Sequence, residues 1–226
     1  MNLVVALDGP SASGKSTIAH ILAKRLGLVH VDTGAMYRAV TLLCFKRGVD
    51  PKDEKKACEL LKDADIKLTI DDKVILNGED VTKEIRNKYV SDNVSYIASY
   101  KTVRLFLVEQ QRKLADNLSI VMDGRDIGTY VLPEADVKIY QVASVETRAQ
   151  RRYKENQEKG ISTSYEEVLE NLKKRDYIDS HRDFAPLKPA KDSIILDTSN
   201  LTIEQVVDEC ERIIKEKVKE RNENIG

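Results

Sequence analysis

Short apolar segments alternate with longer amphipathic segments along most of this chain. The apolar segments have the length of strands and cover residues 3–8, 28–31, 119–122, 137–140 and 193–196. Between them, apolar residues recur three or four positions apart, which is typical of helices. Strands that alternate with helices predict an α/β fold with a parallel sheet covered on both faces, and ligands of such sheets bind beyond the carboxyl ends of the strands.

Helices are expected wherever the apolar residues show helical spacing. The first two of them should end at Gly27 and Gly48, because glycine commonly terminates a helix. The expected helices cover residues 18–26, 35–47, 53–62, 91–116 with a break near Tyr100, 145–159, 165–178 and 202–221.

The stretch from Ile66 to Val81 departs from this pattern. Apolar and polar residues alternate over 66–70, a polar turn follows at 71–73, and 74–76 is apolar again. Asn77-Gly78 is a strong turn signal. The stretch therefore predicts a small antiparallel hairpin inserted into the α/β chain.

The segment Gly9-Pro10-Ser11-Ala12-Ser13-Gly14-Lys15-Ser16-Thr17 fits the pattern G-x-x-x-x-G-K-[ST] at every fixed position. It stands between an expected strand and an expected helix, where loop N–H groups and the helix N-terminus together bind phosphate. We expect Lys15 to reach the β- and γ-phosphates of a nucleotide and the Ser16 hydroxyl to hold Mg²⁺. A plain glycine-rich turn is the alternative, which the flanking elements disfavour.

Further candidate residues follow the ends of two other expected strands. Either Asp32 or Thr33 is expected to cap the next helix, and Arg38 to bind a second phosphate. Asp123 is placed like a strand-end carboxylate that helps to hold Mg²⁺, and Arg125 suits bidentate phosphate binding. Ordinary capping and a surface ion pair remain the alternatives for these positions.

Arg148, Arg151 and Arg152 lie on one face of an expected helix, because they are three and four residues apart. This face predicts either a mobile basic lid over transferring phosphates or a solvated, ion-paired surface. A second helical face is expected to carry Arg175 and Asp179 together with residue 182, although such a pairing alone means little.

Composition narrows the class of protein. The chain of 226 residues has 37 basic and 38 acidic side chains and a net charge of −1, which argues against a general nucleic-acid or membrane binder. Its three widely spaced cysteines and the absence of a leader-like N-terminal segment predict a cytoplasmic protein without a membrane span. Its three histidines lie far apart and predict neither a catalytic triad nor a metal site.

Four strings of residues together resemble the bacterial cytidylate kinase family. They cover 8–17, 32–38 and 122–129, and the fourth is Arg175-Asp176 continuing to Arg182. The resemblance extends along nearly the whole chain and includes the insertion near 66–81, which other nucleoside monophosphate kinases lack.

This resemblance implies a P-loop nucleoside monophosphate kinase fold, in which helices flank a five-stranded parallel sheet. A small antiparallel sheet is inserted into that fold, and a helical segment forms a lid. It further implies one domain over 1–226, with a core at about 1–32 and 101–226, a monophosphate-binding subdomain at about 33–100 and the lid at about 148–164.

The resemblance also implies that a monomer transfers the ATP γ-phosphate to CMP or dCMP with Mg²⁺, without a nucleic acid polymer or a membrane as partner. Catalysis is implied for Lys15 and the three lid arginines, ATP binding for residues 9–17, and Mg²⁺ binding for Ser16 and Asp123. The implied substrate-binding residues are Ser95, Arg104 and Asp126 for cytosine, Arg38, Arg125 and Arg182 for the acceptor phosphate, Arg175 and Asp179 for the sugar, and Thr33.

Two alternatives stay open at this point. A kinase for another small acceptor, such as UMP or shikimate, is disfavoured by the insertion and by the presence of both Arg104 and Asp126. A phosphate-loop switch such as a GTPase is disfavoured because the chain lacks an Asn-Lys-x-Asp guanine motif. The residues that contact adenine are not evident, and the segment Asp197-Thr198-Ser199 is only a candidate.

Overall fold

The computed structural model describes residues 2–225, and its centre is a five-stranded sheet. The strands lie in the order β2-β6-β1-β7-β8, and every neighbouring pair is parallel. This confirms the parallel sheet expected from the apolar segments. The strand bounds are β1 (Val4–Asp8), β2 (Val29–Asp32), β6 (Ile120–Gly124), β7 (Val137–Val142) and β8 (Ile194–Asp197).

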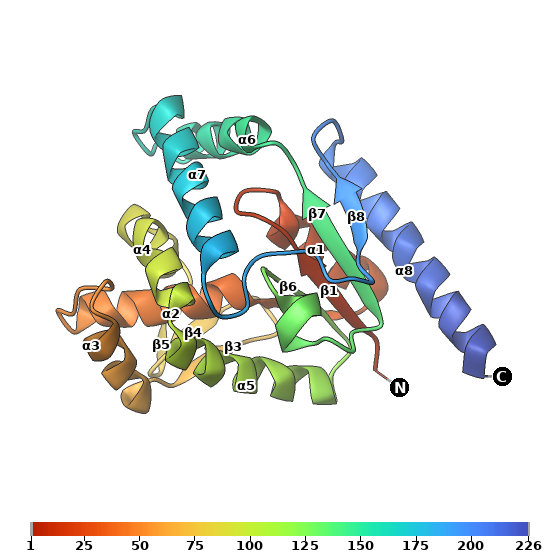
Figure 1. Cartoon of the computed structure of the whole chain (residues 1–226), viewed down its shortest axis with the longest axis horizontal. Coiled ribbons are helices and arrows are strands. Elements are labelled where there is room, and N and C mark those ends of the chain that lie inside the picture. The colour runs from red at the N-terminus through yellow and green to blue at the C-terminus, as the bar shows by residue number, and fades with distance from the viewer. Residues whose placement is uncertain (1, 226) are drawn as a thin grey trace.

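Helices cover both faces of this sheet (Figure 1). Side chains of a strand alternate between faces, so Val5 and Leu7 pack on one side of β1 and Ala6 on the other. Helices α1 and α8 cover the first side, and α5 covers the second. The helices are α1 (Lys15–Leu26), α2 (Thr33–Lys46), α3 (Glu54–Glu59), α4 (Lys88–Ser99), α5 (Lys101–Asn117), α6 (Val145–Glu158), α7 (Tyr165–His181) and α8 (Ile203–Ile225).

The inserted segment forms an antiparallel sheet of three strands, β3 (Ile66–Leu68), β4 (Val74–Leu76) and β5 (Glu79–Asp80). The first two are the expected hairpin. The third has only two residues, and it pairs with β4 because the chain turns back at Asn77-Gly78, where both residues have positive φ. Val74 and Leu76 pack into a core shared with α2, α3 and α4, so the insert is joined to these helices.

Helices α6 and α7 pack against each other beyond one end of the sheet (Figure 1). Their contact buries Ala149, Val168 and Leu172, and α7 begins at a capping box formed by Ser164 and Glu167. The expected lid at 148–164 covers most of α6 and its connection to α7. Closure of that segment stays a prediction.

Several helix ends differ from the expected ones for identifiable reasons. Helix α2 begins at Thr33 rather than at residue 35, because the carboxylate of Asp32 caps it by accepting the N–H of Ala35 at 2.9 Å. Two helices do meet at Tyr100, as expected. A single π-helical turn at Ile127–Val131 follows β6 and was not predicted.

Helix α7 ends at His181, and Arg182 follows with a non-helical ψ of 141°. Arg182 is still placed by the helix, because its φ is −64° and its N–H donates to the Ile178 carbonyl at 3.1 Å, so it lies on the same buried helical face as Arg175 and Asp179, as expected. The expected end at Ile178 relied on the last apolar residue, whereas the helix continues through Asp179, a buried carboxylate. Among the helices at residues 2–225, none combines the length and the apolar character that a membrane span requires.

Candidate active site

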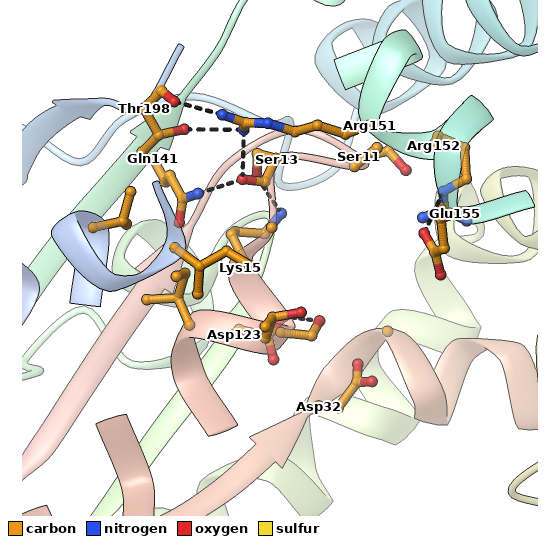
Figure 2. Close-up of a pocket in the computed structure, with 18 of the residues that line it drawn as sticks. Ser11, Ser13, Lys15, Asp32, Asp123, Gln141, Arg151, Arg152, Glu155 and Thr198 are labelled. Atoms are coloured by element: carbon orange, nitrogen blue, oxygen red, sulfur yellow. Dashed lines mark hydrogen bonds and ion pairs between the residues drawn. The ribbon is translucent and has the colours of Figure 1, made fainter. Parts of the chain in front are cut away.

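The glycine loop joins β1 to α1 and passes very close to β7. A Cβ on Gly9 would lie 2.1 Å from the carbonyl oxygen of Gln141, and φ at Gly9 is +150°, so only glycine fits there. The side-chain amide of Gln141 donates to the Ser13 carbonyl and anchors the loop. The loop borders a cavity of about 420 Å³ at the carboxyl end of the sheet, where the strand order predicted a ligand (Figure 2).

Lys15 begins α1 and lines this cavity, with only 5% of the residue exposed. Its Nζ donates to the Pro10 carbonyl at 2.7 Å and to the Ser13 hydroxyl at 3.2 Å. Burial and then the positive charge of Arg125 lower the pKa of Lys15. An anion in the cavity would oppose both effects, so this ammonium group is suited to a phosphate. Its contact with phosphate stays a prediction.

The Ser16 hydroxyl and the Asp123 carboxylate meet on the same wall of the cavity. Ser16 Oγ donates to Asp123 Oδ2 at 2.8 Å. Burial acts to raise the pKa of Asp123, but the hydrogen bond and charge of His30 outweigh it and hold that pKa below its usual value. An ionised carboxylate beside a hydroxyl supplies the oxygen ligands that Mg²⁺ prefers, so these two residues fit the ion.

The sequence left open whether Asp32 or Thr33 caps helix α2, and the structure assigns the cap to Asp32. Asp32 caps α2, and burial followed by the charge of Asp123 raises its pKa. Thr33 instead donates its hydroxyl to the Asp123 carbonyl at 2.7 Å. A Cβ on Gly124 would lie 2.7 Å from that hydroxyl, so the close approach of α2 to β6 requires glycine in the string after the strand.

The residues expected to recognise cytosine come together in a buried group. Arg104 Nη2 donates to Asp126 Oδ2 at 2.5 Å, and Arg104 is 1% exposed. Arg182 Nη2 donates to Asp126 Oδ1 at 3.4 Å, and both arginines donate to the Ala98 carbonyl. Ser95, which is also buried, lies one helical turn before Ala98 on α4. Arg182, expected at the acceptor phosphate, is thus placed beside the expected base residues.

Two buried polar atoms in this group have no hydrogen-bond partner among the described residues. They are Arg104 Nε and the Tyr37 hydroxyl. The Arg104 guanidinium lies over the Tyr37 ring, 5.3 Å from its centroid. Buried polar atoms are nearly always paired, so two unpaired donors beside an Arg–Asp pair indicate that a polar ligand belongs here.

The residues expected at the acceptor phosphate and sugar form a strongly basic region. Arg38 and Arg175 line a second cavity of about 510 Å³, and Asp179 Oδ2 accepts a hydrogen bond from Arg125 Nε at 3.1 Å. Burial and then Arg175 lower the pKa of Arg38 to about 9, and burial and then Arg125 lower that of Arg175 to about 10. Guanidinium groups that repel one another in a buried place favour the binding of an anion.

The three arginines of α6 have different surroundings. Arg148 is buried and donates to both carboxylate oxygens of Asp176, at 3.1 and 2.6 Å, and it is not among the residues that line the 420 Å³ cavity. Arg151 and Arg152 do line it (Figure 2). Arg151 Nη2 donates to the Thr198 carbonyl at 2.5 Å, whereas Arg152 Nε lies 3.2 Å from Glu155 Oε2. The candidate adenine segment thereby borders the cavity through Thr198.

Sequence reasoning missed two residues of this site. Asp8 accepts the N–H groups of Ile127 and Gly128, both at 2.8 Å, and burial raises its pKa to about 7. It thus fixes the turn after Asp126, and its position at the end of β1 was the available signal. The exposed Arg86 lies 3.6 Å from the Asp32 carboxylate and lines the 420 Å³ cavity. Nothing in the local sequence indicated that Arg86 belongs to the site.

Two histidines also meet here, which their separation in the sequence did not predict. The scattered histidines predicted neither a catalytic triad nor a metal site, but the β3–β4 turn brings Asp72 into contact with both His20 and His30. His30 Nε2 lies 2.8 Å from Asp123 Oδ1. Burial acts to lower the pKa of His30, but the hydrogen bond and charge of Asp123 outweigh it and raise that pKa to about 9.

Comparisons with known proteins agree with one another. A family model described as cytidylate kinase matches residues 5–216. A cytidylate kinase of Leuconostoc mesenteroides is 52% identical over 220 residues, covering 96% of this chain and 98% of the relative. One of Bacillus subtilis is 47% identical over 218 residues, covering 95% and 97%. A crystal structure of an uncharacterized protein from Eubacterium ventriosum shares the fold, with a TM-score of 0.55, 12% identity and coverage of 96% and 99%.

Proposed function

The chain belongs to the cytidylate kinase family, and we propose that it transfers the γ-phosphate of ATP to CMP or dCMP, giving ADP and CDP or dCDP. We expect it to act as a cytoplasmic monomer and to require Mg²⁺. Lys15 and residues 9–17 would bind the ATP phosphates, and the group around Arg104 and Asp126 would bind the base.

One observation carries this proposal. At the carboxyl end of β6, Asp123 contacts Ser16 of the phosphate loop. Asp126, only three residues further along the chain, contacts Arg104. A phosphate-loop site and a buried, incompletely paired polar group are thereby held next to each other by one short segment. This arrangement suits a reaction that joins a nucleoside triphosphate to a second nucleotide.

The residues act mainly by positioning and by charge. Phosphoryl transfer needs little covalent help from the protein, and an ionised acceptor phosphate requires no general base. Arg38, Arg125 and Arg175 would hold that phosphate, and Lys15 would stabilise negative charge on the transferring group. Ser16 and Asp123 would hold Mg²⁺, which when bound supplies further charge neutralisation. Arginines of α6 would close over the phosphates and exclude water.

The direct test of this function is the stoichiometry of products. Purified protein with ATP, Mg²⁺ and CMP should form CDP and ADP in equal amounts, measured by ³¹P NMR. Removal of Mg²⁺ with a chelator should stop the reaction. Release of ADP and inorganic phosphate at the same rate without CMP would instead indicate a nucleotide hydrolase or switch.

Alanine substitutions of the three arginines of α6 should have different effects on kcat and on thermal stability. Arg152→Ala should lower kcat far more than it weakens CMP binding, because an arginine aimed at the transferring group contributes roughly 10³–10⁵-fold in related chemistry. Arg148→Ala should in addition reduce thermal stability, because it leaves Asp176 without its bidentate partner. Lys154→Ala, on the same helix and exposed, is the matched control. Unchanged kcat in Arg148→Ala, Arg151→Ala and Arg152→Ala would show that none of these arginines acts on the transferring group.

Asp179→Ala should affect CMP and dCMP unequally. The two acceptors differ only at the 2′ position of the sugar, and a buried carboxylate held by Arg125 is suited to a ribose hydroxyl. The measurement is kcat/KM for each acceptor in the wild type and the variant, with the exposed Asp183→Ala as control. Equal losses for both acceptors would show that Asp179 does not distinguish the sugars.

A further inference from the structure

His20, His30 and Asp72 meet beside the proposed nucleotide site, and each comes from a different part of the fold. His20 lies on α1, His30 on β2, and Asp72 in the turn between β3 and β4. His20 Nδ1 is 2.6 Å from Asp72 Oδ2, and His30 Nδ1 is 2.8 Å from Asp72 Oδ1. The three ligand atoms all lie within 4.8 Å of one another.

The donor set of this cluster favours a particular kind of ion. Mg²⁺ and Ca²⁺ prefer sites built only of oxygen, whereas two imidazole nitrogens and one carboxylate suit Zn²⁺. Ligand atoms at about 2.0–2.1 Å from a tetrahedral Zn²⁺ lie about 3.3 Å apart. The imidazole nitrogens lie 2.6 and 2.8 Å from the Asp72 oxygens, which is shorter than that spacing, so binding would move the ligands apart and replace the hydrogen-bonded contacts of Asp72 by bonds to the metal.

An entry path and a place for a fourth ligand are present. The cluster lines a cavity of about 290 Å³, and the side chains of His20 and Asp72 are partly exposed to solvent, at 40% and 34%. His30 is nearly buried, with 8% of its side chain exposed. Three protein ligands with water in the fourth position are a common arrangement for Zn²⁺.

The second nitrogen of His30 is held in the way that metal-binding histidines usually are. His30 Nε2 lies 2.8 Å from Asp123 Oδ1, while Nδ1 faces Asp72. A histidine that ligates a metal generally donates its other ring N–H to a carboxylate, which orients the ring and makes the ligating nitrogen more basic. Asp123 thus supplies the outer carboxylate of a carboxylate–histidine–metal arrangement.

Asp72 is the member that comes from the inserted sheet. Its φ of +59° is unusual for a residue other than glycine, and its N–H donates to the Thr69 carbonyl within the turn. The turn therefore directs the carboxylate at two imidazoles that belong to the core. A metal ion shared by the three residues would connect the insert to α1 and β2.

We propose that His20, His30 and Asp72 form a binding site for one Zn²⁺ ion, which fastens the inserted antiparallel sheet to the core. The site adjoins the Ser16–Asp123 pair, because Asp123 contacts His30 and Ser16 lines the same cavity, but Zn²⁺ binding does not depend on the proposed nucleotide chemistry.

The binding test uses metal-stripped full-length protein titrated with Zn²⁺ in excess Mg²⁺, followed by calorimetry and by metal analysis after dialysis. The wild type should bind one Zn²⁺ per chain. His20→Gln and Asp72→Asn should each weaken binding by about tenfold or more, since even residues that only support ligands change affinity by about that factor. His181→Gln and Asp71→Asn should bind like the wild type. Lack of saturable binding, or wild-type affinity in both cluster variants, would overturn the proposal.

Two further measurements identify the ligands and the role of the ion. Co²⁺ bound in place of Zn²⁺ should give d–d absorption without a thiolate charge-transfer band, and Cys58→Ser should not change it. Zn²⁺ should slow amide hydrogen exchange over residues 66–76 in the wild type but not in His20→Gln. A thiolate band would place the ion elsewhere, and unchanged exchange in the wild type would overturn the fastening role. His20→Gln should keep the wild-type kinase rate in Mg²⁺ alone.

Discussion

Lys15→Met should lower kcat by about 10²–10³-fold or more while the protein stays folded. The Lys15 ammonium lies inside the phosphate loop and lines the cavity, where charge shifts during phosphoryl transfer would occur. Methionine retains the length of the apolar stem but donates no hydrogen bond and carries no charge. The measurement is the steady-state rate with saturating ATP and CMP.

Folding must be checked separately, because Lys15 is buried and holds the Pro10 carbonyl and the Ser13 hydroxyl. Loss of these contacts should reduce the free energy of unfolding only modestly, by about 1–3 kcal/mol. Lys24→Met, at an exposed position on the same helix, should have near-normal kcat and stability. A folded Lys15→Met protein with near-normal kcat would contradict the assignment of the loop.

Asp126→Asn should narrow the preference for CMP over UMP. Cytosine has an amino donor at N4 where uracil has an acceptor at O4, and a carboxylate can only accept. Asp126 receives one hydrogen bond from Arg104 and one from Arg182, which leaves lone pairs for the amino group. Asparagine supplies an N–H that can face O4.

The size of the effect follows from what uracil would leave unpaired. A carboxylate would face a carbonyl oxygen, and the N3–H of uracil would face the Arg104 guanidinium. Each buried polar group left without a hydrogen-bond partner costs about 1–3 kcal/mol of binding free energy, and more where the group is charged. The wild type should therefore prefer CMP by roughly two to four orders of magnitude in kcat/KM. Asp126→Asn should reduce that ratio and also lower the absolute rate, since it weakens the contact with Arg104.

The measurement is kcat/KM for both acceptors in the wild type and in Asp126→Asn, with thermal melting to confirm that the variant folds. Asp183→Asn, exposed and outside the buried group, should keep the wild-type ratio. If the wild type discriminates but Asp126→Asn has the same ratio, another residue reads the base.

The sheet and the phosphate loop were predictable because their signals are local. An apolar strand, a glycine loop and a helix follow one another at Val4–Leu26, where the apolar pattern locates the strand and helix and the G-x-x-x-x-G-K-[ST] string locates the loop. The expected hairpin was also correct, since the alternation over 66–70, the polar turn at 71–73 and the apolar stretch 74–76 are all local signals. Strand β5 has two residues, which is too short for any alternation to be recognised.

Side-chain partners were much less predictable, because they depend on contacts between distant segments. The spacing of Arg148, Arg151 and Arg152 correctly placed them on one helix, but it did not show that Asp176 binds Arg148. The expected end of α7 at Ile178 was wrong because the helix continues through the buried Asp179, beyond its last apolar residue. The meeting of His20 with His30 depends on how the insert docks, which no local pattern encodes.

The most direct test of the central claim is a single assay of ADP release with CMP, dCMP, UMP and shikimate as acceptors, and with none. A kinase specific for CMP or dCMP should show high kcat/KM for one or both of these acceptors and a kcat/KM for UMP that is roughly two to four orders of magnitude lower. It should not phosphorylate shikimate, and it should release little ADP without an acceptor. Equal use of CMP and UMP, or ADP release that does not depend on an acceptor, would contradict the claim.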